Sequence, residues 1–231
     1  MDQNQRKPIN KKKVVTSIIT VSALAGTGYG ANRLAADPVG EKDCPPLFAE
    51  YAAPDSSQVN VEIAPLSAGD MLKWEQKGGT INDVSCLNRT PVYGIVKITS
   101  VDDIKNALIF AKENKLKISM AGVKHSMGGH AFYKNNLVLD MKGFNQIELN
   151  EAEKTITVQS GATWHDIQNL LHPKYAVKAM QSTDIFTVGG SISVNAHGMD
   201  HLAGSVGSSI QSMRVMLADG TVSMTVVGKS A

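Results

Sequence analysis

The order of secondary structure between Gly94 and Lys142 is the feature that most constrains the fold. The apolar run GIVKIT at 94–99 predicts a strand. The residues SVDDIKNALIFAKENK that follow predict a helix, with Ser100 as N-cap and Asp103 completing a capping box. Two further strands are expected at KISMAG and LVLDMK. Strand, helix and strand with short connections favour a parallel α/β unit, because parallel neighbours need a crossover.

The segment after these strands has the pattern of antiparallel structure. IELN and KTITVQSG flank the polar stretch EAEK as in a hairpin, and Asp219-Gly220 predicts a two-residue hairpin turn. Between them, Thr163 is expected to cap a short helix. That helix should turn three apolar side chains inward: Trp164, Ile167 and Leu170. The chain is therefore expected to be α+β, with an α/β first subdomain around a small parallel sheet and a second subdomain of antiparallel strands and helices.

Two glycine-rich stretches indicate a ligand with phosphate groups. AGVKHSMGGHAF, at 121–132, follows an expected strand, and its glycines let backbone N–H groups approach an anion closely. A tight turn with incidental histidines is the alternative. In FTVGGSISVNAHG, at 186–198, Thr187 can cap a helix whose first turn would offer the free N–H groups of Gly189 and Gly190. Two such stretches favour a long diphosphate cofactor over a single phosphate.

The distribution of charge separates the first residues from the rest. The first 13 residues hold five Lys or Arg and one Asp, a charge of +4, which leaves −2 for the remainder of a chain whose net charge is +2. A mildly acidic remainder excludes the basic footprint of a nucleic-acid-binding protein. No Cys and His spacing resembles a zinc site, so no metal is expected.

The basic start runs into an uncharged apolar stretch, Val14 to Ala31, which is typical of a targeting segment. Residues 1–36 are therefore expected to be a signal peptide or a membrane anchor. A signal peptide is favoured by Ala23 and Ala25, which fit a small-x-small cleavage pattern. An anchor is favoured by the length of the apolar stretch, which approaches the roughly 20 residues of a spanning helix. A disordered basic tail is the alternative. Lysines on the inner side predict an exported, periplasmic or membrane-anchored protein with its body outside the cytoplasm.

Residues 37–90 are rich in Pro, Asp and Ser and predict an extended segment. This range holds both cysteines of the chain, Cys44 and Cys86. In an exported protein the two could form a disulfide, and otherwise they are buried or free thiols.

Four motifs in a fixed order resemble a known family. They are G-x-x-H-S-x-G-G at 122–129, V-Q-S-G-A-T-W-x-D-I at 158–167, T-V-G-G-S-I-S-V-N-A-H-G at 187–198 and A-D-G-T-V at 218–222. From about Pro91 to Val227 the chain is similar to the FAD-binding domain of the vanillyl-alcohol oxidase and para-cresol methylhydroxylase (PCMH-type) flavoproteins. The resemblance implies a PCMH-type FAD-binding fold and FAD as the cofactor.

The resemblance also implies which residues surround FAD. The loop 121–127 would hold the pyrophosphate with its backbone, and His125 stands where many relatives attach the flavin 8α-methyl group through a histidine nitrogen; the alternative is a histidine that only packs against the ring. His130 and His197 would be structural or contact the flavin. The full set of cofactor-binding residues expected is Ala121, Gly122, Val123, Lys124, His125, Ser126, Met127, Gln181, Ser182, Thr187, Gly189, Gly190, Ser193, Asn195 and Gly198.

The chain departs from the family after the last motif, since relatives continue into a substrate-binding domain that supplies the catalytic base. Residues 91–231 are thus expected to be an FAD-binding domain that is incomplete at its C-terminus, and no catalytic residue is assigned. The resemblance implies oxidation of an alcohol, lactone, hydroxy acid or amine by hydride transfer to the flavin, with oxygen or a quinone-like acceptor. The alternatives are a truncated non-catalytic fragment and a flavin-binding subunit that a separate chain completes.

Overall fold

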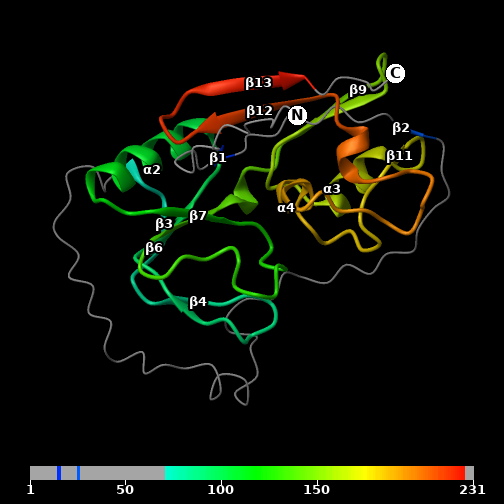
Figure 1. Cartoon of the computed structure of the whole chain (residues 1–231). Helices are drawn as coiled ribbons and strands as arrows, with labels where there is room; N and C mark the ends of the chain where they lie inside the picture. The colour runs from blue at the N-terminus through cyan, green and yellow to red at the C-terminus, as the bar shows by residue number, and fades with distance from the viewer. Residues whose placement is uncertain (1–14, 17–24, 27–70, 227–231) are drawn as a thin grey trace, which may run out of the picture.

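The computed structural model describes residues 15–16, 25–26 and 71–226, which form two parts side by side (Figure 1). The first part contains a four-stranded sheet and one long helix, and the second contains hairpins and short helices. Each part has its own hydrophobic core. The expected α+β class and the division into a mainly parallel and an antiparallel subdomain are confirmed.

The sheet of the first part has the strand order β3-β6-β8-β7. The strands β6 (Gly94–Lys97), β8 (Leu137–Asp140) and β7 (Ile118–Ala121) are parallel, as the sequence predicts. The edge strand β3 (Trp74–Lys77) is antiparallel to β6 and lies within the range expected to be an extended segment. Its register shifts between Trp74 and Gln76. Only Trp74 of its four residues is apolar, so the sequence lacks the alternation of apolar and polar residues that would reveal a strand.

The helix α2 (Val101–Glu113) connects β6 to β7 and covers one face of this sheet (Figure 1). Its start is the capping box that the sequence predicts: the Ser100 hydroxyl accepts from the Asp103 N–H, and the Asp103 carboxylate accepts from the Ser100 N–H. The helix buries an apolar face against the sheet, formed by Ile104, Ala107, Phe110 and Ala111. Smaller elements complete this part: β4 (Thr80–Ile81), β5 (Thr90–Pro91) and the 3-10 helix η4 (Met141–Gly143).

The second part begins with the expected hairpin of β9 (Ile147–Asn150) and β10 (Thr155–Val158). The helix α3 (Trp164–Leu171) follows, capped by Thr163 and Asp166. The expectation for Leu170 is wrong, because Leu171 is buried and Leu170 is 46% exposed. With Trp164 and Ile167 buried, the residue one turn further on the same face is Leu171. The remaining elements before the last hairpin are β11 (Ala176–Val177), α4 (Val188–Ser193) and η5 (Val206–Ser209).

The last hairpin joins β12 (Ser212–Leu217) to β13 (Val222–Val226) and differs in its turn from the prediction. The Leu217 N–H donates to the Thr221 carbonyl and the Gly220 N–H to the Leu217 carbonyl, so the loop has three residues instead of two. Gly220 has a φ of +85°, as expected where a type I turn is followed by a residue in the left-handed region.

The strand β12 contributes to both cores. Met216 is fully buried in the core of the first part, and Met213 packs against the core of the second part. Because the two residues differ by three positions along a strand, they point to opposite faces of it. β12 therefore contacts both parts, and in Figure 1 it runs across the top of them.

Most of the expected targeting segment, and Cys44, lie outside the described residues. Within 1–36 the structure describes β1 (Val15–Thr16), which pairs with β12, and β2 (Ala25–Gly26), which pairs with β11. Cys86 is disulfide-bonded. Among the described residues, no helix is both long and apolar enough to cross a membrane.

Candidate functional site

The structure brings the two glycine-rich stretches into contact. The first stretch leaves the end of β7 at Ala121, and a Cβ atom on Gly122 would lie 2.9 Å from Thr187 Cγ2 and closer still to Thr187 Oγ1. Thr187 is the residue that caps α4, and it also forms a β-bridge with Thr163. The stretches are 65 residues apart between Gly122 and Thr187, so the folding of the second part onto the first creates this junction.

The first stretch has a backbone suited to an anion. Lys124 and Met127 have φ values of +61° and +52°, an uncommon conformation for residues other than glycine. Among the described residues, none accepts a hydrogen bond from the N–H groups of Lys124, His125 or Ser126. Consecutive N–H groups around a left-handed residue form a concave anion site. The loop 121–127 is therefore a candidate anion site, and its assignment to the FAD diphosphate stays a prediction.

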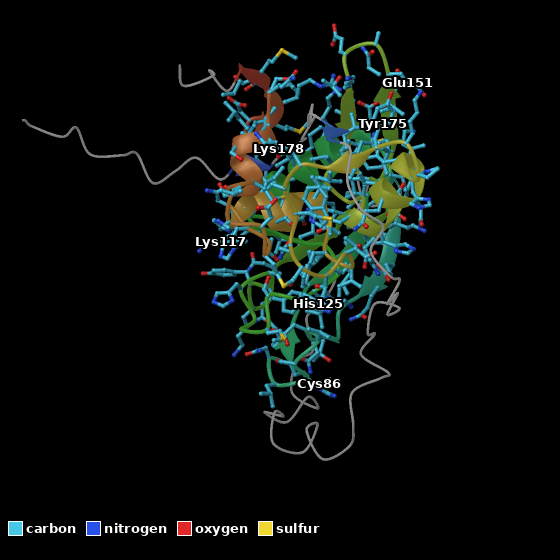
Figure 2. The ribbon with its side chains drawn as sticks, turned by 90° about the vertical axis from the view of Figure 1, so that its right-hand side faces the viewer. Cys86, Lys117, His125, Glu151, Tyr175 and Lys178 are labelled. Atoms are coloured by element: carbon cyan, nitrogen blue, oxygen red, sulfur yellow. The ribbon has the colours of Figure 1, made fainter. Side chains whose placement is uncertain are left out.

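The ring of His125 is held in one orientation. Its Nδ1 lies 2.9 Å from the Val123 carbonyl oxygen, and the ring packs edge-on against Phe186 with centroids 5.3 Å apart. A carbonyl oxygen only accepts, so Nδ1 carries the hydrogen. In the neutral ring the lone pair is then on Nε2. The half-buried ring lies between the second part and the segment around Cys86 (Figure 2).

The second stretch departs from the prediction in its hydrogen bonds. The Gly189 N–H donates to the Ser160 carbonyl (2.9 Å), and the Gly190 N–H donates to the Thr187 hydroxyl (3.4 Å). The expectation that both groups are free is therefore wrong. The start of α4 is docked on the backbone after β10, where a Cβ on Gly189 would lie 2.9 Å from the Ser160 carbonyl oxygen. Glycine at 189 serves this close approach.

Of the other expected residues of the second stretch, Ser193, Asn195 and Gly198 contact nearby backbone, and Gly190 lies at the surface. Ser193 donates to the Gly189 carbonyl, and the Asn195 side chain accepts from the Gly207 N–H. Gly198 packs on the Met180 carbonyl, with no room for a side chain. Gly190 is exposed, and a Cβ there would meet a single described atom within 4 Å, Thr187 Oγ1 at 3.2 Å.

The residues at 181–182 differ in their roles. Ser191, a buried residue of α4, accepts from the Trp164 indole N–H at 2.8 Å and donates to the Gln181 side chain. Gln181 is thereby fixed beside α4, whereas the side chain of Ser182 is exposed to solvent. Trp164 is 2% exposed and belongs to the core, as predicted.

The segment Asn82–Asn88, to which the sequence analysis gave no role in the site, forms three hydrogen bonds with the first stretch. The Val84 N–H donates to the Lys124 carbonyl, and the Asn88 amide donates to the Met127 carbonyl. The Gly129 N–H donates to the Asp83 carboxylate. Cys86, with its disulfide, lies in the same segment. The cluster of Asn, Asp and Ser in NDVSCLN was the available signal, since such residues bond to nearby backbone.

Asp83 is the centre of that segment. Burial raises its pKa, but hydrogen bonds from the Ser85 hydroxyl, the Gly129 and Ser85 N–H groups and the Asn88 amide outweigh burial and lower the pKa below its ordinary value of 3.8. The residue is only 3% exposed. Asp83 is therefore an ionised carboxylate whose acceptor sites are occupied by protein donors.

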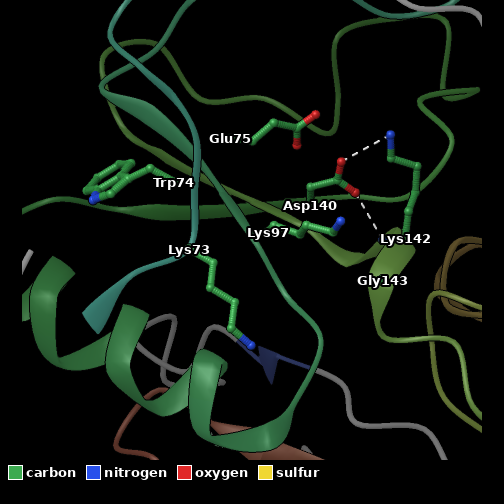
Figure 3. A pocket seen from close by; sticks show the side chains of 7 residues that line it. All are labelled: Lys73, Trp74, Glu75, Lys97, Asp140, Lys142 and Gly143. Carbon is green, nitrogen blue, oxygen red and sulfur yellow. Dashed lines mark hydrogen bonds and ion pairs between the residues drawn. The ribbon is translucent and has the colours of Figure 1, made fainter. Parts of the chain in front are cut away.

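A pocket opens at the edge where β6 and β8 end, lined by Lys73, Trp74, Glu75, Lys97, Asp140, Lys142 and Gly143 (Figure 3). Lys142 forms an ion pair with Asp140 at 3.1 Å. Burial raises the pKa of Glu75, and the nearby Asp140 raises it further, while Lys142 and Lys124 oppose the shift. Asp140 is also in register with Ala121, so this pocket adjoins the strand end from which the first stretch starts.

The remaining histidines differ in their surroundings. His130 and His197 are exposed, and His197 Nδ1 lies 3.0 Å from the Gly198 carbonyl. His165 pairs with Asp184 at 2.9 Å and ties α3 to the stretch before Phe186. Within the described part of the chain, no group of His, Cys, Asp or Glu could hold a metal ion.

These features define a class of protein. A loop of open N–H groups after a parallel strand, joined to the capped start of a helix in an antiparallel subdomain, forms a binding module for a diphosphate-containing cofactor. The family model described as "FAD binding domain" matches residues 92–225, and the chain belongs to this family. The cofactor is FAD, and the expected PCMH-type domain is confirmed.

Curated relatives match the same region at modest identity. Decaprenylphosphoryl-beta-D-ribose oxidase of Mycolicibacterium smegmatis is 30% identical over 115 residues, which are 48% of this chain and 25% of that protein. L-gulonolactone oxidase of Mus musculus is 26% identical over 130 residues, 54% of this chain and 28% of that protein. The chain thus spans little more than a quarter of the length of these two relatives.

Solved structures share the fold. A variant of Phl p 4, a glucose dehydrogenase, superimposes with a TM-score of 0.53 at 18% identity, covering 59% of this chain and 29% of that chain. A variant of Physcomitrella patens BBE-like 1 gives a TM-score of 0.51 at 23% identity, covering 64% and 32%.

Proposed function

We propose that this chain is the FAD-binding part of an oxidoreductase that takes a hydride from a carbon bearing a hydroxyl or amine group. The junction of Gly122 with Thr187 carries the proposal, because it places the open N–H groups of the first stretch beside the second stretch. FAD supplies the redox chemistry when bound. The chain supplies the diphosphate site and a fixed imidazole.

Three relatives favour a substrate class within this reaction. The names decaprenylphosphoryl-beta-D-ribose oxidase, L-gulonolactone oxidase and glucose dehydrogenase all denote sugars or sugar lactones. We therefore place sugar-like alcohols and lactones ahead of hydroxy acids and amines. The test is anaerobic bleaching of bound flavin by a panel of aldoses, alditols and aldonolactones, followed by recovery of the colour with oxygen or a quinone. Bleaching by an amine alone would exclude the sugar class.

We further propose that His125 attaches the flavin through Nε2. Support comes from the bond of Nδ1 to the Val123 carbonyl, which leaves the lone pair on Nε2. With FAD bound, His125 would form a C–N bond to the 8α carbon. The methyl C–H and imidazole N–H bonds would break, and the two protons released and the two electrons left on the flavin would pass to an acceptor such as oxygen, which becomes hydrogen peroxide. Acid precipitation of purified protein tests this: yellow colour should stay in the pellet and be lost in His125→Ala. His130→Ala, a change at an exposed histidine of the same loop, should keep the colour.

A competing proposal is a non-catalytic flavin-binding chain that needs a partner for substrate turnover. A yellow protein whose flavin no substrate bleaches, until a candidate partner is added, would favour this alternative. A colourless protein that takes up no added FAD would exclude both proposals.

Export of the chain, or anchoring with its body outside the cytoplasm, is also a proposal. It is supported by the apolar stretch 14–31 and by the disulfide at Cys86, since disulfides persist in oxidising compartments. Sequencing the N-terminus of the mature protein distinguishes a cleaved signal from an anchor. An intact Met1 on a protein found in the cytoplasm would refute the proposal.

A further inference from the structure

We propose that Asp83 is a positioning residue for the FAD diphosphate, acting through the loop 124–129. The inference rests on the proposed function, because it assigns a role within the same site. Asp83 does not face the ligand in this scheme. It orders the segment Asn82–Asn88, and that segment sets the direction of the peptide groups in the loop.

Asp83 organises its own segment through its carboxylate. One carboxylate oxygen accepts from the Ser85 N–H (3.0 Å) and hydroxyl (2.5 Å), and the other accepts from the Asn88 amide (2.9 Å). The buried side chain of Asn82 adds three bonds: its oxygen accepts from the Asp83 and Asn88 N–H groups, and its amide donates to the Cys86 carbonyl. The segment is thereby a rigid support.

Three hydrogen bonds connect this support to the loop. The Val84 N–H donates to the Lys124 carbonyl at 3.1 Å, the Asn88 amide to the Met127 carbonyl at 3.3 Å, and the Gly129 N–H to Asp83 at 2.8 Å. These bonds span 39 to 46 residues of sequence for the side-chain pairs. They connect the support to the beginning, middle and end of the loop.

In a planar trans peptide the C=O and N–H groups point in opposite directions. The carbonyls of Lys124 and Met127 point into the support, so the N–H groups of the same peptide units, those of His125 and Gly128, point away from it. The two carbonyl groups, which would repel an anion, therefore point away from the open side of the loop. The N–H groups of His125 and Gly128 point toward that side and can donate to an anion. An ordered nest of N–H groups binds a diphosphate with less loss of conformational entropy than a mobile loop.

The charge of Asp83 is compatible with this role. Its pKa is lowered by its hydrogen bonds, and protein donors occupy its oxygens. A carboxylate neutralised by donors in this way can support an anion site without facing the anion.

The experiment measures binding of FAD and of ADP, a probe that carries the diphosphate without the flavin, by calorimetry. All variants are made in the full chain with His125→Ala, so that flavin stays exchangeable. Asp83→Asn should weaken both ligands by roughly tenfold or more, the loss expected when a charged hydrogen-bonding partner is removed. Asn88→Ala, which leaves Asp83 in place but removes the donor to Met127, should weaken both by a smaller factor.

The matched control is Asn114→Ala. Asn114 is half-buried and its amide also donates to a backbone carbonyl, that of Phe110 at 2.9 Å, but at the end of α2. Its variant should bind both ligands as the parent does. The amide NMR signals of Gly128 and Gly129 should move in Asp83→Asn and stay in Asn114→Ala.

Each outcome decides the matter. A folded Asp83→Asn with parental affinity for FAD and ADP overturns the inference while the proposed function stands. If Asp83→Asn does not fold, Asn88→Ala decides in the same way. A parent that binds neither ligand removes the proposed function and this inference with it.

Discussion

The junction between the two glycine-rich stretches makes a quantitative prediction for Gly122→Ala. The new methyl group would meet the Thr187 side chain alone among its nearest atoms, with Cγ2 at 2.9 Å, Cβ at 3.1 Å and Oγ1 closer still. Overpacking of this kind costs about 1–3 kcal/mol of unfolding free energy. Thr187→Ala by itself removes the cap of α4 and should cost about 1 kcal/mol.

The double variant separates a specific clash from general damage. Once Thr187 is alanine, the two closest atoms are gone and the remaining contact, at 3.1 Å, needs a shift of only a few tenths of an ångström. The double variant should therefore be more stable than the sum of the single effects implies, with a coupling of about 1–2 kcal/mol. Urea unfolding followed by tryptophan fluorescence gives the three values, because Trp164 lies next to the junction.

Gly190→Ala is the control for this cycle, since its Cβ would meet the same Thr187 hydroxyl at 3.2 Å and no second atom of the described residues within 4 Å. It should cost far less than Gly122→Ala. Additive effects of Gly122→Ala and Thr187→Ala, within about 0.3–0.5 kcal/mol, would refute the reasoning, because the two stretches would then not touch as described.

Three further predictions concern stability. Burial alone would raise the pKa of Asp103, but hydrogen bonds from Lys73, Thr99 and Ser100 lower the pKa to about 2. About 2 kcal/mol of stability should therefore be present above pH 3.8 and lost as the pH falls toward 2. Asp103→Asn should flatten this part of the plot of unfolding free energy against pH. Leu171→Ala should lower the unfolding free energy measured in urea by about 2–5 kcal/mol, whereas Leu170→Ala, at an exposed position, should lower it by less than about 0.5 kcal/mol. Equal losses of stability would contradict the assigned buried face of α3. Cys86→Ser should cost about 2–4 kcal/mol and weaken FAD binding, whereas a loss of stability with full FAD affinity would show that the disulfide does not support the loop.

Local signals made much of the fold predictable. The capping boxes at Ser100 and Thr163 involve residues three positions apart, so the starts of α2 and α3 could be read from neighbouring letters. The same holds for the parallel strands, whose apolar runs are continuous because both faces are covered. The first glycine-rich stretch was also predictable as a loop after a strand, because clustered glycines interrupt the apolar pattern there.

The features that could not be predicted depend on contacts between distant residues. The strand β3 is recognisable only through its pairing with β6, and the role of Asp83 only through a loop 46 residues away. The Gly189 N–H looked free in the sequence because its acceptor, the Ser160 carbonyl, is brought to it by the docking of α4. In each case the decisive partner is a backbone group, whose position no residue type reveals.

The strand β12 limits how the two parts can move relative to each other. Met216 anchors one of its faces in the first core and Met213 packs its other face on the second. An extended strand cannot lengthen along its axis. A lengthwise shift of one part relative to the other would therefore remove Met213 or Met216 from the core against which it packs. β12 therefore holds the two cores in a fixed lengthwise relation.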